Sequence, residues 1–259
     1  METRTADLTT AVASAAGAVV LWEVLVRLFG VPTFILPAPT QVLWEAAARH
    51  RLYLYHSWVT LYETLAGFLL AAVVGVIMAV GVVYSRFLLN ATYPLIVALQ
   101  IVPKVAIAPL LLIWAGYGVT SKVLLALLVA FFPIVVNMVT GLWAVEPELL
   151  ELCRILHSGR WQELYKVRLP NALPYLFSGL KVASTLAVIG AVIGEFVGGN
   201  EGLGYLIIIA NTELRTPMAF ASLVGLSILG LGLFGALAVA ERLLMPWERR
   251  AHPEPTGGI

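Results

Sequence analysis

The stretch ELCRILHSGRWQELYKVRLP, Glu151–Pro170, is strongly polar although the chain around it is apolar. Apart from Cys153, eight of its twenty side chains are ionisable, whereas 12% of the whole 259-residue sequence is charged and 60% is hydrophobic. The mean hydropathy of the chain is +0.92, which is more than a water-soluble domain can hide in one core. The sequence therefore predicts an all-α membrane protein with one polar segment that contacts something other than lipid.

Six apolar stretches are long enough to cross a bilayer, which takes roughly 20 residues. They lie near Thr10–Gly30, Thr60–Tyr84, Tyr93–Trp114, Lys122–Leu142, Ser178–Gly198 and Ala219–Ala240. The third contains Pro103, Lys104 and Pro109, so we expect it to be kinked or broken. We interpret the first as a retained span, with a signal peptide as the alternative, because its apolar run is long and lacks a clean cleavage site.

The distribution of Lys and Arg predicts the orientation, because short cytoplasmic loops are enriched in them. With the N-terminus inside, the inner segments hold nine of these residues and the outer segments hold four, Lys122 among them. Both termini and the stretch Glu151–Pro170 are thus expected in the cytoplasm. The segment Pro37–Trp58 predicts a short amphipathic helix on the outer surface.

Two short amphipathic helices joined by a turn at Ser158 and Gly159 are predicted around the polar stretch. Their apolar faces hold Leu149, Leu152, Cys153 and Leu156 in the first helix and Trp161, Leu164 and Tyr165 in the second. The second helix is expected to end before Pro170, since the residue before a proline avoids the α region. Such a pair can rest on lipid headgroups or dock a cytoplasmic partner, and the pattern alone leaves both open.

The polar stretch resembles the EAA loop of ABC importer permeases, whose pattern opens on Glu-Ala-Ala, continues to a glycine and closes on Ile-x-Leu-Pro. Val167, Leu169 and Pro170 match the closing half, while Leu152, Cys153 and His157 replace the alanines and the glycine. The segments Ile101–Leu142 and Gly194–Ile207 are similar to the nitrate/sulfonate/taurine-type branch of these permeases. The resemblance covers roughly residues 58–245.

This resemblance implies a type I ABC importer permease of about six transmembrane helices in the inner (plasma) membrane of a prokaryote. Residues 10–245 would form the permease domain, with a coupling loop at 145–170, between a cytoplasmic N-terminus (1–9) and a disordered cytoplasmic tail (246–259). The implied partners are two ATPase subunits that bind ATP and Mg, an extracytoplasmic substrate-binding protein and a second permease copy. The loop residues carried over are Glu151, Leu152, Cys153, His157, Gly159, Arg160, Trp161, Val167, Leu169 and Pro170.

No catalytic, metal or cofactor site is predicted in this chain, which we expect to be a non-catalytic subunit. It lacks the G-x-x-x-x-G-K-[ST] pattern that binds ATP, and GLGLFG at Gly230–Gly235 lies in an apolar span with no preceding strand, unlike a dinucleotide site. The single cysteine, Cys153, can form neither an intrachain disulfide nor a metal cluster. No dense basic tract indicates nucleic-acid binding.

Polar residues within the spans are candidates for a transport pathway or gate, because burying them in lipid is unfavourable. Glu195 and Lys104 are predicted to line the path or to pair near a gate, and Asn137 is a third candidate. A position of Glu195 at the outer headgroup level is the alternative. Gly190, Gly194 and Gly198 recur every fourth residue, a spacing that lets helices approach closely at a dimer seam, at a pore wall or within the chain.

The cargo is the least determined feature. The form GEFVGG, Gly194–Gly199, is similar to the members that carry vitamins such as riboflavin or pyrimidine precursors, with sulfonate, taurine and nitrate as the next candidates. The alternative function is that of a stand-alone secondary transporter. Such a protein usually shows coupling-ion sites and an internal repeat, and the sequence displays neither.

Overall fold

The computed structural model describes residues 2–246, and every regular element in that range is a helix. In chain order these are α1 (Glu2–Leu28), α2 (Pro39–Ala48), α3 (His50–Tyr84), α4 (Arg86–Ile101), α5 (Lys104–Ala115), α6 (Val119–Trp143), α7 (Pro147–Ile155), α8 (Arg160–Glu163), a π-helical turn η1 (Leu164–Arg168), α9 (Leu169–Gly198), α10 (Leu203–Thr212) and α11 (Thr216–Leu244). The predicted all-α class is confirmed. The tail expected to be disordered lies, from residue 247 on, outside the described residues.

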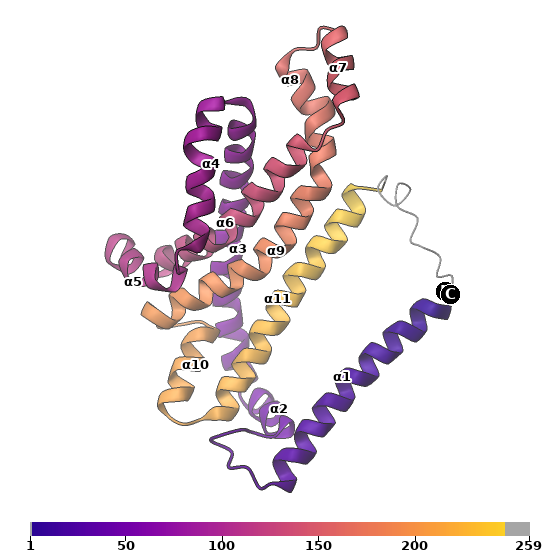
Figure 1. Cartoon of the computed structure of the whole chain (residues 1–259). Helices are drawn as coiled ribbons and strands as arrows, with labels where there is room; N and C mark the ends of the chain where they lie inside the picture. The colour runs from indigo at the N-terminus through magenta and orange to yellow at the C-terminus, as the bar shows by residue number, and fades with distance from the viewer. Residues whose placement is uncertain (1, 247–259) are drawn as a thin grey trace. The chain divides into compact units, whose positions relative to one another are not determined.

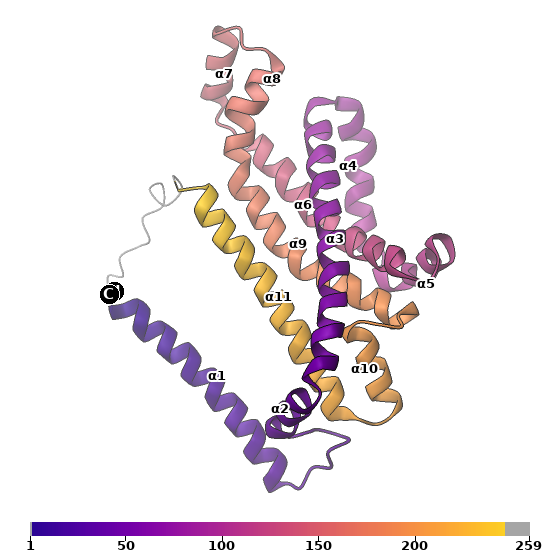
Figure 2. The same cartoon turned by 180° about the vertical axis from the view of Figure 1, so that it is seen from behind.

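The chain divides into two compact units. Unit 1 comprises Met1–Val59 and Asn200–Ser227, and unit 2 comprises Thr60–Gly199 and Ile228–Ile259. Within unit 2, α6 and α9 run side by side along most of their lengths (Figures 1 and 2). This pair is the framework on which the other helices of unit 2 pack.

Small residues bring α3, α6 and α9 into close contact. A Cβ atom added to Gly190 of α9 would lie 2.6 Å from the Cα of Ala126 on α6, and one added to Gly67 of α3 would lie 2.4 Å from the Cβ of the same alanine. No side chain fits at either glycine without displacing backbone. In lipid, where helices gain little from hydrophobic burial, such close van der Waals packing is a main source of association.

Two groups of buried apolar side chains fill the interior of unit 2. The first holds Ala79, Val82, Ile96, Phe132, Val135, Met138, Val139, Leu142, Leu164 and Ala172, and the second holds Phe68, Ala71, Ala130, Ile134, Ala183 and Ala187. Both draw on α3, α6 and α9. The same three helices carry the buried polar residues of unit 2, among them Thr60, Glu63, Lys122 and Glu195.

Four helical runs are long and apolar enough to cross a membrane: α3, α6, Arg160–Gly198 and α11. They contain the second, fourth, fifth and sixth predicted spans, which are confirmed by length and composition. The first predicted span falls in α1, which is not one of these four within the residues described.

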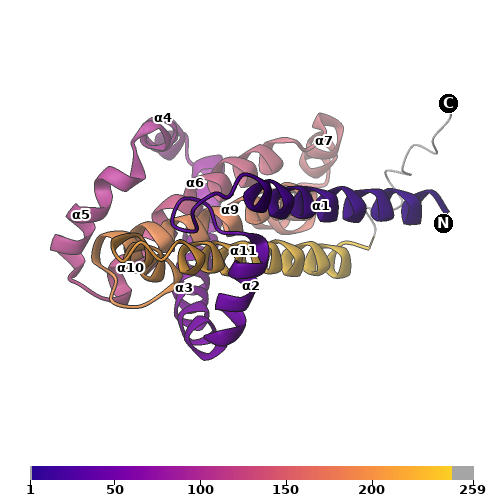
Figure 3. The same cartoon turned by 90° about the horizontal axis from the view of Figure 1, so that it is seen from below.

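The third predicted span is divided between α4 and α5, as its prolines indicate. Val102, between the two helices, has φ −64° and ψ 127°, the extended conformation that a residue before proline prefers. Pro103 follows in an extended conformation and α5 begins at Lys104. The chain changes direction sharply at this break (Figure 3). The two helices have 16 and 12 residues, so neither equals a full span of roughly 20 residues.

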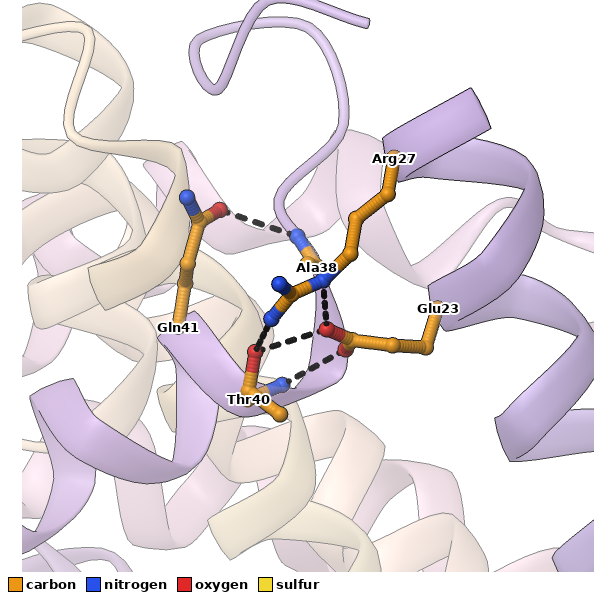
Figure 4. Close-up of polar contacts among 5 residues, drawn as sticks. All are labelled: Glu23, Arg27, Ala38, Thr40 and Gln41. Carbon is orange, nitrogen blue, oxygen red and sulfur yellow. Dashed lines mark hydrogen bonds and ion pairs between the residues drawn. The ribbon is translucent and has the colours of Figure 1, made fainter. Parts of the chain in front are cut away.

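In unit 1 a polar network joins α1 to the start of α2 (Figure 4). The carboxylate of Glu23 accepts the backbone N–H of Thr40 at 3.0 Å and its hydroxyl at 2.9 Å, and Arg27 donates to both side chains. The N-cap of α2 is Ala38, which has no side-chain acceptor. Glu23 therefore supplies from another helix the acceptor and the negative charge that a helix N-terminus needs. The short helix predicted within Pro37–Trp58 is confirmed as α2, and its place on the outer surface stays a prediction.

Candidate functional site

The turn between α7 and α8 has the geometry of a Schellman motif. The N–H of Ser158 bonds to the carbonyl of Cys153 at 2.9 Å, and the N–H of His157 bonds to the carbonyl of Arg154 at 3.0 Å. His157 has φ 50°, the left-handed conformation that favours glycine. His157 is also the residue that stands where the EAA pattern has a glycine. The histidine thus adopts, with some backbone strain, a conformation that a glycine takes without it.

Helices α7 and α8 expose apolar side chains. They form a pair beyond the ends of α6 and α9 (Figure 1), and no residue of α7 is buried. The exposed fractions are 73% for Ile155, 67% for Leu156 and 80% for Trp161. Glu151 and Arg160 are exposed as well, whereas Cys153 is half-buried. Most members of the two predicted apolar faces are exposed in the single chain, whereas Leu164 of the second face is buried in the interior of unit 2.

Arg168 fixes this loop to the end of α6. Its Nε donates to Oε1 of Glu163 at 2.6 Å, and its Nη1 donates to the carbonyl of Leu142 at 2.8 Å. A cation at a helix C-terminus satisfies the last carbonyls and interacts favourably with the helix dipole. The hydroxyl of Tyr84 also donates to the carbonyl of Arg160 at 3.4 Å. The part of the loop that follows its turn is thus attached to α3 and α6 by polar contacts.

Pro170 does not end the second helix, so that expectation is wrong. The π-helical turn Leu164–Arg168 joins α8 to α9 without a break, and the N–H of Leu169 bonds to the carbonyl of Leu164, five residues earlier. Pro170 falls in the first turn of α9. In a π-helical turn each N–H bonds to the carbonyl five residues earlier instead of four. This wider turn accommodates the ring of Pro170, which has no N–H to donate. Val167 and Leu169 are half-buried within this continuous helix.

Glu195 is buried in unit 2 among polar side chains from three helices. Its Oε1 accepts the hydroxyl of Thr60 on α3 at 2.7 Å, and it lies close enough to Glu63 on α3 to contact that carboxyl group. Glu63 is paired with Lys122 of α6 at 2.7 Å. Lys104 lies elsewhere: its ammonium donates to the carbonyl of Gln100 and sits 5.2 Å from the ring centroid of Phe132 on α6. In this structure Lys104 and Glu195 have different partners.

The other predicted residues of unit 2 take local roles in packing. The Nδ2 of Asn137 donates to the carbonyl of Pro133 at 2.8 Å, one turn earlier on α6. Gly190 and Gly194 lie against α6, and Gly198 lies against Leu112 of α5. Of the uses left open for the glycine row, packing within the chain is the one that these contacts display.

Comparison with known proteins assigns the chain to a family. The family described as the binding-protein-dependent transport system inner membrane component matches residues 71–245, which include the loop, α6, α9 and the last part of α3. The chain belongs to this family. The prediction of an ABC importer permease is therefore confirmed, and the permease is a multi-pass protein of the inner membrane.

Relatives and solved structures agree with the assignment. The permease is 42% identical over 232 residues to the riboflavin transport system permease protein RibX of Chloroflexus aurantiacus, covering 88% of this chain and 86% of the relative. It is 36% identical to the formylaminopyrimidine transport permease protein ThiX of Halalkalibacterium halodurans, covering 89% and 92%. An inward-facing structure of the MetNI methionine ABC transporter matches with a TM-score of 0.64 at 21% identity, over 72% of this chain and 93% of that chain. This likeness confirms the type I permease fold.

Sequence reasoning missed the buried ion pair of Glu63 and Lys122 that lies beside Glu195. Lys122 is counted among the four basic residues of the outer segments, but it is buried and paired with Glu63, so it does not belong in the count of loop charges. Glu63 escaped notice because it lies near the start of a predicted span, where a charge at the headgroup level is ordinary. One signal could have found both residues. Each lies one helical turn before a small residue of the same span, Glu63 before Gly67 and Lys122 before Ala126.

Proposed function

We propose that two copies of this permease form the pathway for a small organic nutrient, with riboflavin or a pyrimidine precursor as the first candidate. Sulfonate, taurine or nitrate come next. The named cargo of RibX and the similarity to ThiX support the order. An extracytoplasmic binding protein delivers the nutrient, and ATP and Mg bind to two separate ATPase subunits. The permease binds no cofactor itself, and both of its termini lie in the cytoplasm.

The uncovered apolar side chains of α7 and α8 carry this proposal. Large exposed apolar side chains gathered on a short loop outside the hydrophobic spans, with charged residues among them, are typical of a protein interface. Trp161, exposed to 80%, is the kind of large aromatic that anchors an interface. A pocket of about 240 Å³ beside it, lined among others by Tyr84 and Arg160, offers space for a side chain of the partner.

We assign this face to the ATPase and not to lipid because of how the loop is held. A helix pair that rests on headgroups needs no fixed orientation relative to the spans. Here Arg168, which also bonds to Glu163 within the loop, ties the loop to the carbonyl of Leu142 on α6, and the π-helical turn makes the loop continuous with α9. Movement of a docked ATPase would therefore be transmitted to the spans, where the two states of the permease differ in access.

Docking is tested by replacing Glu151 with lysine and measuring how much ATPase co-purifies with the permease. We expect association to fall, because the change reverses a charge on the exposed side of α7. The matched control is Glu213→Lys, at an exposed carboxylate of unit 1 that pairs with Arg215. Undiminished association and uptake in Glu151→Lys would exclude the loop as the docking site.

Transport is tested by uptake into proteoliposomes that contain the permease, its ATPase and its binding protein. We expect accumulation of riboflavin or a formylaminopyrimidine that requires all three proteins and ATP. Uptake by the permease alone, driven by an ion gradient and indifferent to ATP, would establish the secondary-transporter alternative. The substrates are compared in one preparation. ATP-dependent uptake of another substrate without uptake of riboflavin would therefore change the assigned cargo and leave the ATP-driven mechanism intact.

A further inference from the structure

Two carboxyl groups and one ammonium group meet in the interior of unit 2. Glu63, Lys122 and Glu195 are exposed to only 0%, 4% and 1%. They come from α3, α6 and α9, at the level next to the contact of Gly67, Ala126 and Gly190. We propose that Glu63 and Glu195 hold one proton between them, so that together with Lys122 they form an electrically neutral proton site.

The first argument is charge balance. Lys122 compensates one carboxylate, and its Nζ lies 2.7 Å from Oε1 of Glu63. If Glu195 were also ionised, the buried group would carry a net negative charge. An uncompensated charge away from water is strongly unfavourable, and two carboxyl groups that share a site do not both ionise. A proton is the smallest cation that removes the excess charge.

The second argument is an oxygen atom without a donor. Oε2 of Glu63 is buried and has no hydrogen-bond partner among the described residues, although the carboxyl group of Glu195 contacts Glu63. Ionised carboxylates only accept hydrogen bonds, whereas a protonated carboxyl group also donates one. A proton held by Glu195 therefore supplies the donor that Oε2 of Glu63 lacks.

The third argument is space. A Cβ added to Gly194 of α9 would lie 2.9 Å from the Cα of Lys122 and 3.0 Å from its Cγ, so the two helices are in contact at the site. The charged groups that meet here are Glu63 from α3, Lys122 from α6 and Glu195 from α9. The uncharged hydroxyl of Thr60 donates to Glu195. The described residues contain no group of three or more His, Cys, Asp or Glu side chains able to hold a metal ion. A proton fits this site better than a larger cation that needs a shell of oxygen ligands.

The test is infrared spectroscopy of the full-length permease in phosphatidylcholine vesicles at neutral pH. We expect a C=O stretching band of a protonated carboxylic acid that shifts in D₂O and disappears in Glu195→Gln. The matched control is Glu241→Gln in α11, because Glu241 forms a one-to-one ion pair with Lys181 and should be ionised. This control variant is expected to keep the band at full intensity.

Two outcomes would overturn the proposal. The first is a wild-type spectrum without an exchangeable carboxylic-acid band, a result that needs no variant to fold. The second is a band that persists in Glu195→Gln. The measurement is repeated with choline in place of sodium, and a band that appears only without sodium would mean that a sodium ion occupies the site, which also overturns the proton assignment. None of these readouts depends on the cargo or on the ATPase.

Discussion

Replacing His157 with glycine should make the turn after α7 more stable than replacing it with alanine. His157 has φ 50°, where a Cβ atom approaches the following carbonyl oxygen and the strain amounts to about 1–2 kcal/mol. Alanine keeps the Cβ and glycine removes it. Glycine also gives the unfolded chain more freedom, which offsets about 0.4–1 kcal/mol. The net preference for glycine over alanine is thus about 1 kcal/mol.

Cys153 provides the assay, because it is the chain's single cysteine and lies half-buried on α7. Its carbonyl accepts the hydrogen bond of Ser158 that closes the turn, so unfolding of α7 exposes its thiol. The rate at which a maleimide labels the thiol through local opening should be about fivefold lower in His157→Gly than in His157→Ala, as 1 kcal/mol implies.

A position with ordinary helical geometry supplies the control. Glu148 lies in the first turn of α7, where glycine is expected to be less stable than alanine by about 1 kcal/mol. The order of the two variants should therefore reverse between Glu148 and His157. If the thiol of Cys153 is labelled as slowly in His157→Ala as in His157→Gly, or more slowly, the left-handed conformation of His157 is not what this turn requires.

Two further predictions concern the interface and the packing. Trp161→Ala should lower ATPase co-purification at least tenfold, since a buried interface tryptophan contributes about 2 kcal/mol or more, while the melting temperature of the isolated permease stays unchanged because Trp161 is exposed to 80%. Gly190→Ala should lower the melting temperature, since its Cβ would lie 2.6 Å from the Cα of Ala126 and overpacking costs about 1–3 kcal/mol. Gly232→Ala in α11, where a Cβ meets nothing within 4 Å, is its control and should not lower it.

Hydropathy and proline placement were sufficient to predict four spans, the break before Pro103 and the two helices around the turn. These features depend on local pattern, which the sequence displays directly. The partners of Glu195 were not predictable in this way, because Thr60, Glu63 and Lys122 belong to helices far apart in the chain. Periodicity indicates which face of a helix is buried, but it does not say which residue lies opposite.

The error at Pro170 has a similar origin. A residue before proline avoids the α region, and the rule predicts a helix end. It does not anticipate that a π-helical turn can absorb the proline and let the helix continue. The choice between the two depends on contacts outside the local sequence, here that of Arg168 with the carbonyl of Leu142.

The uninterrupted run Arg160–Gly198 makes a mechanical lever of the permease's fifth span. At about 1.5 Å per residue, Trp161 at one end and Glu195 near the other are separated by roughly 50 Å along one rod. A small tilt imposed at Trp161 becomes a displacement several times larger at the distant end if α6 acts as the pivot. The π-helical turn alters the hydrogen bonding of this rod, and so do Pro170 and Pro174, which have no N–H to donate. The stiffness of this segment therefore sets how much of the movement reaches Glu195.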